Sequence, residues 1–158
     1  MVPPDEIVSL LSKVELFRGL DAAVLGAIVS RMSEKVFDRG AVLFHEGDHG
    51  DRLYVLLTGK VRVYAEREGT VITYDLLEAG RCFGEMALIE AAPRSASVRA
   101  EEPCRCLTLG QQDFLELLQA QPRMALTILR DLSLRLRHTN TQIQEFVKQL
   151  TALSKTLI

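Results

Sequence analysis

The middle of the chain consists of short runs of β-forming residues punctuated by glycines. Between Lys35 and Leu109 these runs read VF, VLF, LYVLL, VRVY, VITYDLL and CRCLTL, with glycines at positions 40, 47, 59, 69 and 80. Short runs of this kind, closed by turn residues, are typical of strands joined by tight turns. The pattern predicts a mainly β fold over residues 35–110, an antiparallel β-roll or jelly-roll-like barrel.

Both ends of the chain carry a helical pattern instead. Asp5 could cap a short helix, and Asp21 could cap a second helix that runs to about Met32. The helical period returns at Gln111, breaks at Pro122 and then continues as one long helix. We expect a single domain over residues 1–158, divided into a helical lead-in (1–34), the roll (35–110) and C-terminal helices (111–158).

The long C-terminal helix carries a seam of residues spaced alternately three and four apart. Its members are Leu129, Leu132, Leu136, Thr139, Ile143, Phe146, Leu150, Leu153 and Leu157. Such a heptad seam is typical of a helix that packs on a partner helix. At a rise of about 1.5 Å per residue, the helix extends on the order of 50 Å, longer than a small barrel can cover. A parallel homodimer through residues 123–157 is the simplest solution. In the alternative, the first half packs on the roll and the rest meets another domain or partner.

The composition is that of an ordinary globular domain. Of 158 residues, 47% are hydrophobic and 25% are charged, with a formal net charge of −2. This balance gives no basic surface for direct binding to nucleic acid. The N-terminus, MVPPDEIV, lacks a leader pattern, and no run approaches the roughly 18 apolar residues of a membrane span. We expect a cytoplasmic protein, with no membrane partner, whose cysteines Cys82, Cys104 and Cys106 are reduced.

The segment from Phe83 to Ala96, FGEMALIEAAPRSA, holds one acid and one guanidinium at the two ends of a short apolar stretch. Arg94 offers a planar fork of donors that matches phosphate oxygens. Glu85, an acceptor-only carboxylate, suits a sugar hydroxyl. Gly84 permits close approach of the chain, and Met86 to Ile89 could form a helical turn whose first N–H groups point at an anion. The inferred ligand carries a ribose hydroxyl and a phosphate close together.

This segment resembles the phosphate-binding cassette of the cyclic nucleotide-binding domain family, which includes bacterial catabolite activators, cyclic-nucleotide-dependent kinases and nucleotide-gated channels. The family's slots are filled by Phe83, Gly84, Glu85, Ala87, Leu88, Pro93, Arg94 and Ala96. The family's barrel signature is matched by Phe37, Gly40, Leu43, Phe44, Glu46, Gly47, Tyr54, Val55, Gly59 and Val61. The resemblance implies a β-roll with flanking helices that binds cAMP or cGMP.

The resemblance also implies which residues hold the nucleotide. In the cassette they are Gly84, Glu85, Met86, Ala87, Arg94, Ser95 and Ala96. Because Ser95 resembles the bacterial cAMP-responsive members, cAMP is favoured over cGMP as the ligand, and no cofactor is expected. The pocket would be lined by Val61, Tyr74 and Phe83.

The stretch RLRHTNTQI resembles the part of the dimer helix that contacts adenine in the catabolite activators, and this assigns Thr139 and Asn140 to the base. Thr139 is also the one polar member of the heptad seam. A hydroxyl buried there without a partner costs about 1 to 3 kcal/mol. The nucleotide base could supply that partner, or the hydroxyl could bond to its own helix backbone four residues earlier.

These expectations describe a non-enzymatic sensor that signals through its C-terminal helix to an unidentified effector protein. No helix-turn-helix pattern follows the long helix, so we expect the chain to act on another protein or to belong to a larger regulator. The alternative is a ligand-free dimerisation or adaptor module in which Glu85 and Arg94 form only a structural ion pair.

A zinc-protease motif, H-E-x-x-H, is spelled by His45, Glu46 and His49. The motif binds zinc only when a helix places both histidines on one face. Gly47 and Asp48 in its middle, with strands on both sides, argue against a helix there. We therefore expect no metal site and a turn between barrel strands.

Overall fold

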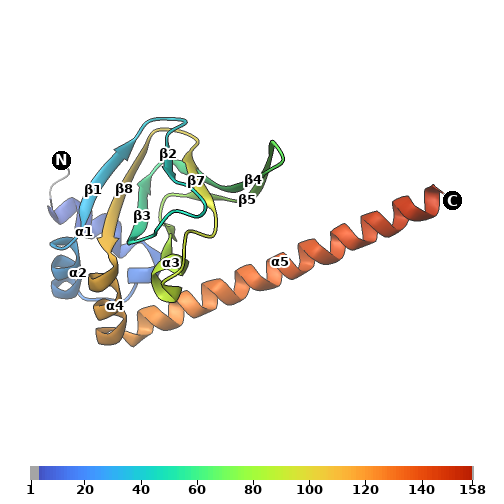
Figure 1. Cartoon of the computed structure of the whole chain (residues 1–158). Helices are drawn as coiled ribbons and strands as arrows, with labels where there is room; N and C mark the ends of the chain where they lie inside the picture. Colours follow the sequence, from blue (N-terminus) through green and yellow to red (C-terminus); the bar gives the residue numbers. More distant parts are fainter. Residues whose placement is uncertain (1–3, 158) are drawn as a thin grey trace. The chain divides into compact units, whose positions relative to one another are not determined.

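The computed structural model describes residues 4–157. The chain divides into two compact units, and the boundary in the sequence lies between Ala120 and Gln121. The first unit begins with two helices and a short 3₁₀ turn, continues as a β-roll and ends in a helix (Figure 1). The elements before the roll are α1 (Pro4–Ser12), η1 (Glu15–Phe17) and α2 (Ala22–Val29), and those inserted in it and after it are α3 (Glu85–Glu90) and α4 (Gln111–Ala120).

The roll consists of two four-stranded antiparallel sheets. In chain order the strands are β1 (Ser33–Phe37), β2 (Val42–Phe44), β3 (Arg52–Thr58), β4 (Lys60–Arg67), β5 (Thr70–Glu78), β6 (Cys82–Phe83), β7 (Ser97–Ala100) and β8 (Cys104–Gly110). One sheet has the order β1-β8-β3-β6 and the other β2-β7-β4-β5. The mainly β roll expected from the glycine-punctuated runs is confirmed. The short strands β6 and β7, which flank the cassette, were not expected.

An apolar cluster packs inside the roll. Its buried members are Tyr54, Leu56, Val61, Leu77, Phe83, Val98, Ala100, Cys104 and Cys106. Cys104 and Cys106 share this interior because they alternate along β8. Burial raises the pKa of the Cys106 thiol to about 12, so the cluster holds it in the neutral form.

The lead-in helices differ from the expectation at their ends. Asp21 does cap α2, because its carboxylate accepts a hydrogen bond from the backbone N–H of Val24 at 2.9 Å. The helix ends at Val29, however, rather than near Met32. Beyond the helix, the N–H groups of Arg31 and Met32 bond to carbonyls three residues back, which tightens the chain before β1 begins. Asp5 lies inside the first turn of α1 rather than at its cap.

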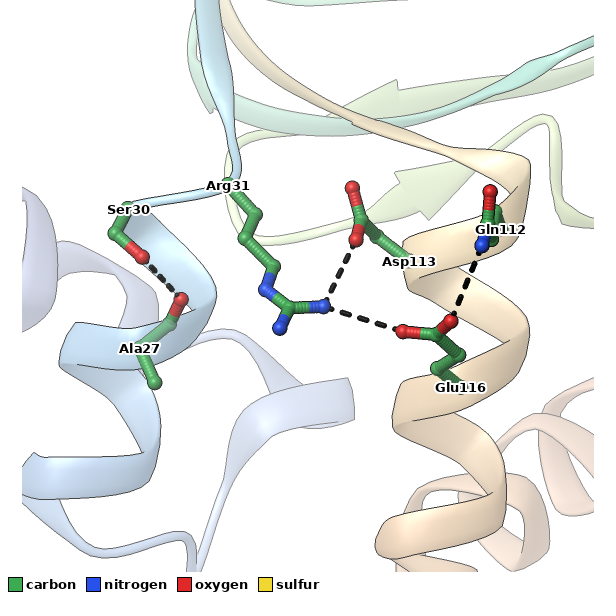
Figure 2. Close-up of polar contacts among 6 residues, drawn as sticks. All are labelled: Ala27, Ser30, Arg31, Gln112, Asp113 and Glu116. Atoms are coloured by element: carbon green, nitrogen blue, oxygen red, sulfur yellow. Dashed lines mark hydrogen bonds and ion pairs between the residues drawn. The ribbon is translucent and has the colours of Figure 1, made fainter.

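An ion-pair cluster joins the end of α2 to α4 (Figure 2). Nη1 of Arg31 lies 2.9 Å from Oδ1 of Asp113 and 3.3 Å from Oε2 of Glu116. Gln112 donates a hydrogen bond to the other carboxylate oxygen of Glu116 at 3.3 Å. The lead-in is thereby tied to the helix that follows the roll, and the side chains concerned remain largely exposed.

The second unit contains the 35-residue helix α5 (Pro122–Thr156), which begins at its proline, one residue before the expected start. Most members of the heptad seam are exposed along it, among them Leu136, Ile143, Phe146 and Leu153. No helix within residues 4–157 is long and apolar enough to cross a membrane.

Candidate functional site

The cassette begins at a sharp turn from β6 into α3. Gly84 adopts the left-handed conformation, with φ of 85°, and forms the N-cap of α3. The helix includes the turn expected over Met86 to Ile89 and begins one residue earlier, at Glu85. It ends at Glu90, and its C-cap, Ala91, is also left-handed. Glu85 is only 6% exposed, so the turn places this carboxylate in the interior face of the helix start.

The far end of the cassette is fixed to the turn between β2 and β3. The backbone N–H of Arg94 donates to the carbonyl of Asp48 at 2.8 Å, and the N–H of Gly47 donates to the carbonyl of Arg94 at 2.9 Å. An isolated antiparallel bridge joins His49 to Pro93. These contacts hold the backbone of Arg94 at a fixed place.

The Arg94 side chain turns into the roll and is 5% exposed. Its Nη1 donates to the carbonyl of Gly84 and its Nη2 to the carbonyl of Arg52, both at 2.8 Å. Its Nε is buried and has no hydrogen-bond partner among the residues that the structure describes. Burial lowers the pKa of Arg94, and the nearby Tyr54 and acidic groups act in the opposite direction.

Arg94 differs from the other arginines of the first unit in the kind of partner it has. Several arginines in this unit are bonded to a carboxylate, namely Arg31, Arg62, Arg67, Arg99 and Arg105. Arg94, although far more buried, makes no ion pair within residues 4–157, and its acceptors are neutral carbonyls. A buried cation that has no ion pair of its own favours the binding of an anion.

Two glycines make room for this guanidinium. A Cβ atom on Gly84 would lie 2.6 Å from Nη1 of Arg94. A Cβ atom on Gly50 would lie 2.7 Å from Nε of Arg94 and 2.7 Å from Cβ of Ala87. Sequence reasoning missed Gly50, because it follows a glycine-containing turn and no pattern separates it from an ordinary loop glycine. The requirement becomes visible only when Arg94 is placed beside it.

The remaining cassette residues differ in their exposure. Ser95 and Met86 are exposed, and the Ser95 hydroxyl makes a weak contact with the Met86 sulfur at 3.9 Å. Ala87 and Ala96 are buried. The predicted cassette residues thus divide into buried ones, which include Arg94, and the exposed pair Ser95 and Met86, whose side chains touch.

The predicted pocket-lining residues separate into two groups. Val61 and Phe83 are buried in the apolar cluster of the roll. Tyr74 is 51% exposed and lies at the register shift of β5, where it has no partner in the pairing with β4. Its role as a lining residue stays a prediction that the position on the strand does not support.

The two residues predicted to contact the base, Thr139 and Asn140, lie on α5 and are exposed there. The Thr139 hydroxyl donates to the carbonyl of Arg135 at 3.0 Å. This is the backbone bond that the sequence left open as an alternative. The same bond is made on α5 by Thr127, Thr141, Thr151 and Thr156. Contact of Thr139 and Asn140 with a base stays a prediction.

The H-E-x-x-H motif is not on a helix. His45 and Glu46 begin the turn after β2, and His45 faces Asp48, with Nδ1 3.8 Å from the carboxylate. Glu46 is held by both Nη atoms of Arg67 at 2.7 and 2.9 Å. Within the described part of the chain, no group of three or more His, Cys, Asp or Glu side chains could hold a metal ion. The expectation of a turn between strands is confirmed.

Comparison with known proteins places this geometry in a family. The model of the cyclic nucleotide-binding domain matches residues 34–121. The cyclic AMP receptor protein of Thermus thermophilus is 33% identical over 129 residues, which cover 81% of this chain and 60% of the relative. The chain likewise spans 62% of a CRP-like cAMP-activated global transcriptional regulator from Mycobacterium tuberculosis, and thus about three fifths of either relative's length.

Solved structures agree with the sequence comparison. The catabolite activator protein of Thermus thermophilus has a TM-score of 0.74 and 33% identity, with 82% of this chain and 62% of that chain covered. The N-terminal domain of a transcriptional regulator from Streptomyces coelicolor A3(2) has a TM-score of 0.66 and 35% identity, with 85% and 94% covered. The family model matches more than half of this chain, which folds as a β-roll with a buried arginine in its cassette. The chain therefore belongs to the cyclic nucleotide-binding domain family.

Proposed function

We propose that this chain binds a cyclic nucleotide, cAMP in preference to cGMP, and acts as a regulatory sensor rather than as a catalyst. The observation that supports this most directly is the state of Arg94. It is a buried cation with two neutral acceptors, no ion pair within residues 4–157 and one unpartnered donor at Nε. A cyclic phosphate supplies a single negative charge and acceptor oxygens, which is what this guanidinium lacks.

In this proposal each part of the ligand meets a different group. The phosphate binds Arg94, Ser95 and backbone N–H groups of the cassette. The cassette surface around it is formed by Gly84, Met86, Ala87 and Ala96. The ribose hydroxyl binds the buried carboxylate of Glu85. The base meets Thr139 and Asn140 on α5. Preference for cAMP is supported by Ser95 and by the matched relative named as a cyclic AMP receptor protein.

The output of the sensor is proposed to be α5. A ligand shifts a conformational equilibrium only through different affinities for its two states, and contacts on α5 would provide that difference. The exposed apolar seam supports pairing of two copies in parallel through residues 123–157. An effector protein, not yet identified, would then read the state of the paired helices.

Calorimetric titration with cAMP and with cGMP tests the binding function. The unaltered chain is expected to bind cAMP more tightly than cGMP, and Arg94→Leu is expected to bind cAMP at least about thirtyfold more weakly, because a phosphate contact to a desolvated charge is lost. Arg94→Leu also leaves the carbonyls of Gly84 and Arg52 without their donor. Arg94→Lys, which keeps the charge, is therefore titrated beside it.

Arg18→Leu is the matched control, because it removes the same charge from an exposed position outside the cassette. Circular dichroism checks that each variant is folded. Heatless titrations of the unaltered chain with both nucleotides at micromolar concentrations would refute the sensor function. Equal affinity of Arg94→Leu and Arg18→Leu would refute the assignment of the phosphate site.

The exposed seam of α5 also supports a second candidate, a dimerisation or adaptor module that binds no nucleotide. In that case the association state and the thermal stability are the same with and without cAMP. A ligand that binds only the folded state raises the unfolding temperature by mass action, so an increase with cAMP concentration contradicts the adaptor function.

A further inference from the structure

Two aromatic rings, Phe44 and Tyr54, lie near the guanidinium of Arg94, and a third, Phe83, packs on both of them. Its Cζ atom is 4.1 Å from the centroid of the Phe44 ring and 5.9 Å from that of Tyr54. Phe44 packs at a tilt on both Tyr54 and Phe83, with centroids 5.5 and 6.2 Å away, and the rings of Tyr54 and Phe83 stack at 5.3 Å. The rings therefore hold one another in place, with Phe44 uppermost against the cation.

A bulge in β2 positions Phe44. Val42 pairs with Arg99 on β7, and two residues later Phe44 pairs with Val98, so the register shifts by one residue between them. A bulge of this kind changes the direction of the side chain that follows it. Phe44 is partly buried and packs against the apolar cluster of the roll on one side while Arg94 lies over its ring.

We propose that Phe44 is a positioning residue for the phosphate, and that its ring fixes the plane of the Arg94 guanidinium. The inference rests on the proposed function, since it concerns the same phosphate. A guanidinium has five N–H donors. Two hydrogen bonds of Arg94, to the carbonyls of Gly84 and Arg52, use one donor on each Nη. Three donors remain for an anion without either bond being broken.

The ring replaces a partner that other arginines of this chain have. Arg67, for example, is oriented by the carboxylate of Glu46 through two hydrogen bonds. A carboxylate beside Arg94 would neutralise the charge that the phosphate needs. A ring face attracts the cation, more strongly where water is excluded, yet leaves its net charge available. An aliphatic side chain at position 44 fills the space without this attraction.

Calorimetric titration of Phe44→Leu and Phe44→Tyr with cAMP tests the role of the ring. Phe44→Leu is expected to weaken binding about three- to thirtyfold, whereas Phe44→Tyr, which keeps the ring, is expected to stay within about twofold. Circular dichroism and thermal unfolding without nucleotide are recorded first. If Phe44→Leu does not fold, Phe44→Met provides an unbranched apolar side chain of similar volume.

Nuclear magnetic resonance of the nucleotide-free chain gives a second measurement, the chemical shifts of the Arg94 side-chain protons. These shifts would not depend on the ring if Phe44 only filled space. The side-chain Nε–H and δ protons of Arg94, identified by their loss in Arg94→Lys, are expected upfield because the guanidinium lies over the Phe44 ring. They are expected to keep this shift in Phe44→Tyr and to lose it in Phe44→Leu or Phe44→Met.

The outcomes separate this inference from the function on which it rests. If the unaltered chain binds neither cAMP nor cGMP, the proposed function is wrong and the inference falls with it. If the unaltered chain binds cAMP and Phe44→Leu binds equally well, only the role of Phe44 is refuted. Equal weakening in Phe44→Leu and Phe44→Tyr also contradicts it, because the ring is present in one variant and absent from the other.

Discussion

The roll and the C-terminal helix differ in which side chains they bury: the roll buries a charged residue, whereas the helix exposes apolar residues. The roll buries a positive charge, since Arg94 is 5% exposed and has no ion pair within residues 4–157. The helix α5 does the reverse, because the seam residue Leu136 is 63% exposed. A buried cation is completed by a small anion, whereas an exposed apolar seam is completed by another apolar surface.

The two regions therefore call for partners of different size. In the proposed function, an anion of a few atoms completes the cassette, and Gly50 and Gly84 leave space around the arginine. The seam of α5 extends over several helical turns, and in the proposed dimer it packs on a second helix of comparable length. Each of the following experiments changes one side of this contrast.

The largest effect is expected on association through α5. Leu136→Lys places a charge in the seam and is expected to weaken dimerisation by at least about a hundredfold, because a buried unpaired charge is costly. Leu134→Lys is the matched control, since Leu134 is 67% exposed and lies two residues away, off the seam. Analytical ultracentrifugation over a concentration series measures both. Equal dissociation of the two variants would show that the seam is not the interface.

A smaller effect is expected from filling the space beside the buried arginine. Gly50→Ala brings a methyl group against Nε of Arg94 and Cβ of Ala87, and overpacking of this kind costs about 1 to 3 kcal/mol. Gly26→Ala is the control, because a Cβ atom there meets nothing within 4 Å and the residue lies inside α2.

Urea unfolding of these two variants measures the difference. We expect the free energy of unfolding to fall in Gly50→Ala and to stay level or rise in Gly26→Ala. Affinity for cAMP is expected to fall in Gly50→Ala alone, because the guanidinium is displaced. A Gly50→Ala variant as stable as the unaltered chain would mean that Arg94 has room to move.

The smallest effect concerns a buried group that the roll keeps neutral. Burial raises the pKa of Cys106 from 9.0 to about 12, so the neutral thiol is favoured in the folded chain. This contribution to stability is complete below pH 9 and is lost as the pH rises towards 12. By pH 10 the loss is expected to be on the order of 1 kcal/mol.

Urea unfolding at pH 8 and pH 10 measures this loss, with Cys106→Ala as the control that cannot ionise. The decrease between the two pH values should be smaller in Cys106→Ala by the amount that Cys106 contributes. An identical decrease in both chains would show that the interior of the roll tolerates a thiolate as well as it tolerates the cation of Arg94.

The sequence predicted the elements that carry a local signal, either a repeated pattern or a residue typical of a helix end. Glycine-punctuated runs predicted the roll, Asp21 predicted a helix cap, and Pro122 predicted the start of α5. The strands β6 and β7 were missed because neither is a run of β-forming residues: β6 has two residues, and β7 reads SVRA, with a single β-branched residue. Their pairing is imposed by neighbouring strands rather than by their own composition.

The cassette could be predicted only as a set of residues. The sequence identified Arg94 and Glu85, but it gave no sign that Arg94 donates to the carbonyls of Gly84 and Arg52. It also missed Gly50 and the ring of Phe44 as neighbours of the guanidinium. These contacts join residues as many as 50 positions apart, and no local spacing encodes them.

The backbone bond of Thr139 determines what its hydroxyl can offer to a base. The single hydroxyl proton is donated to the carbonyl of Arg135, so the oxygen is left as an acceptor only. Adenine presents an amino group, a donor, at the position where guanine presents a carbonyl, an acceptor. If Thr139 meets position 6 of the base, guanine would require the proton to leave Arg135, whereas adenine would not. The helix's own backbone would then select the purine.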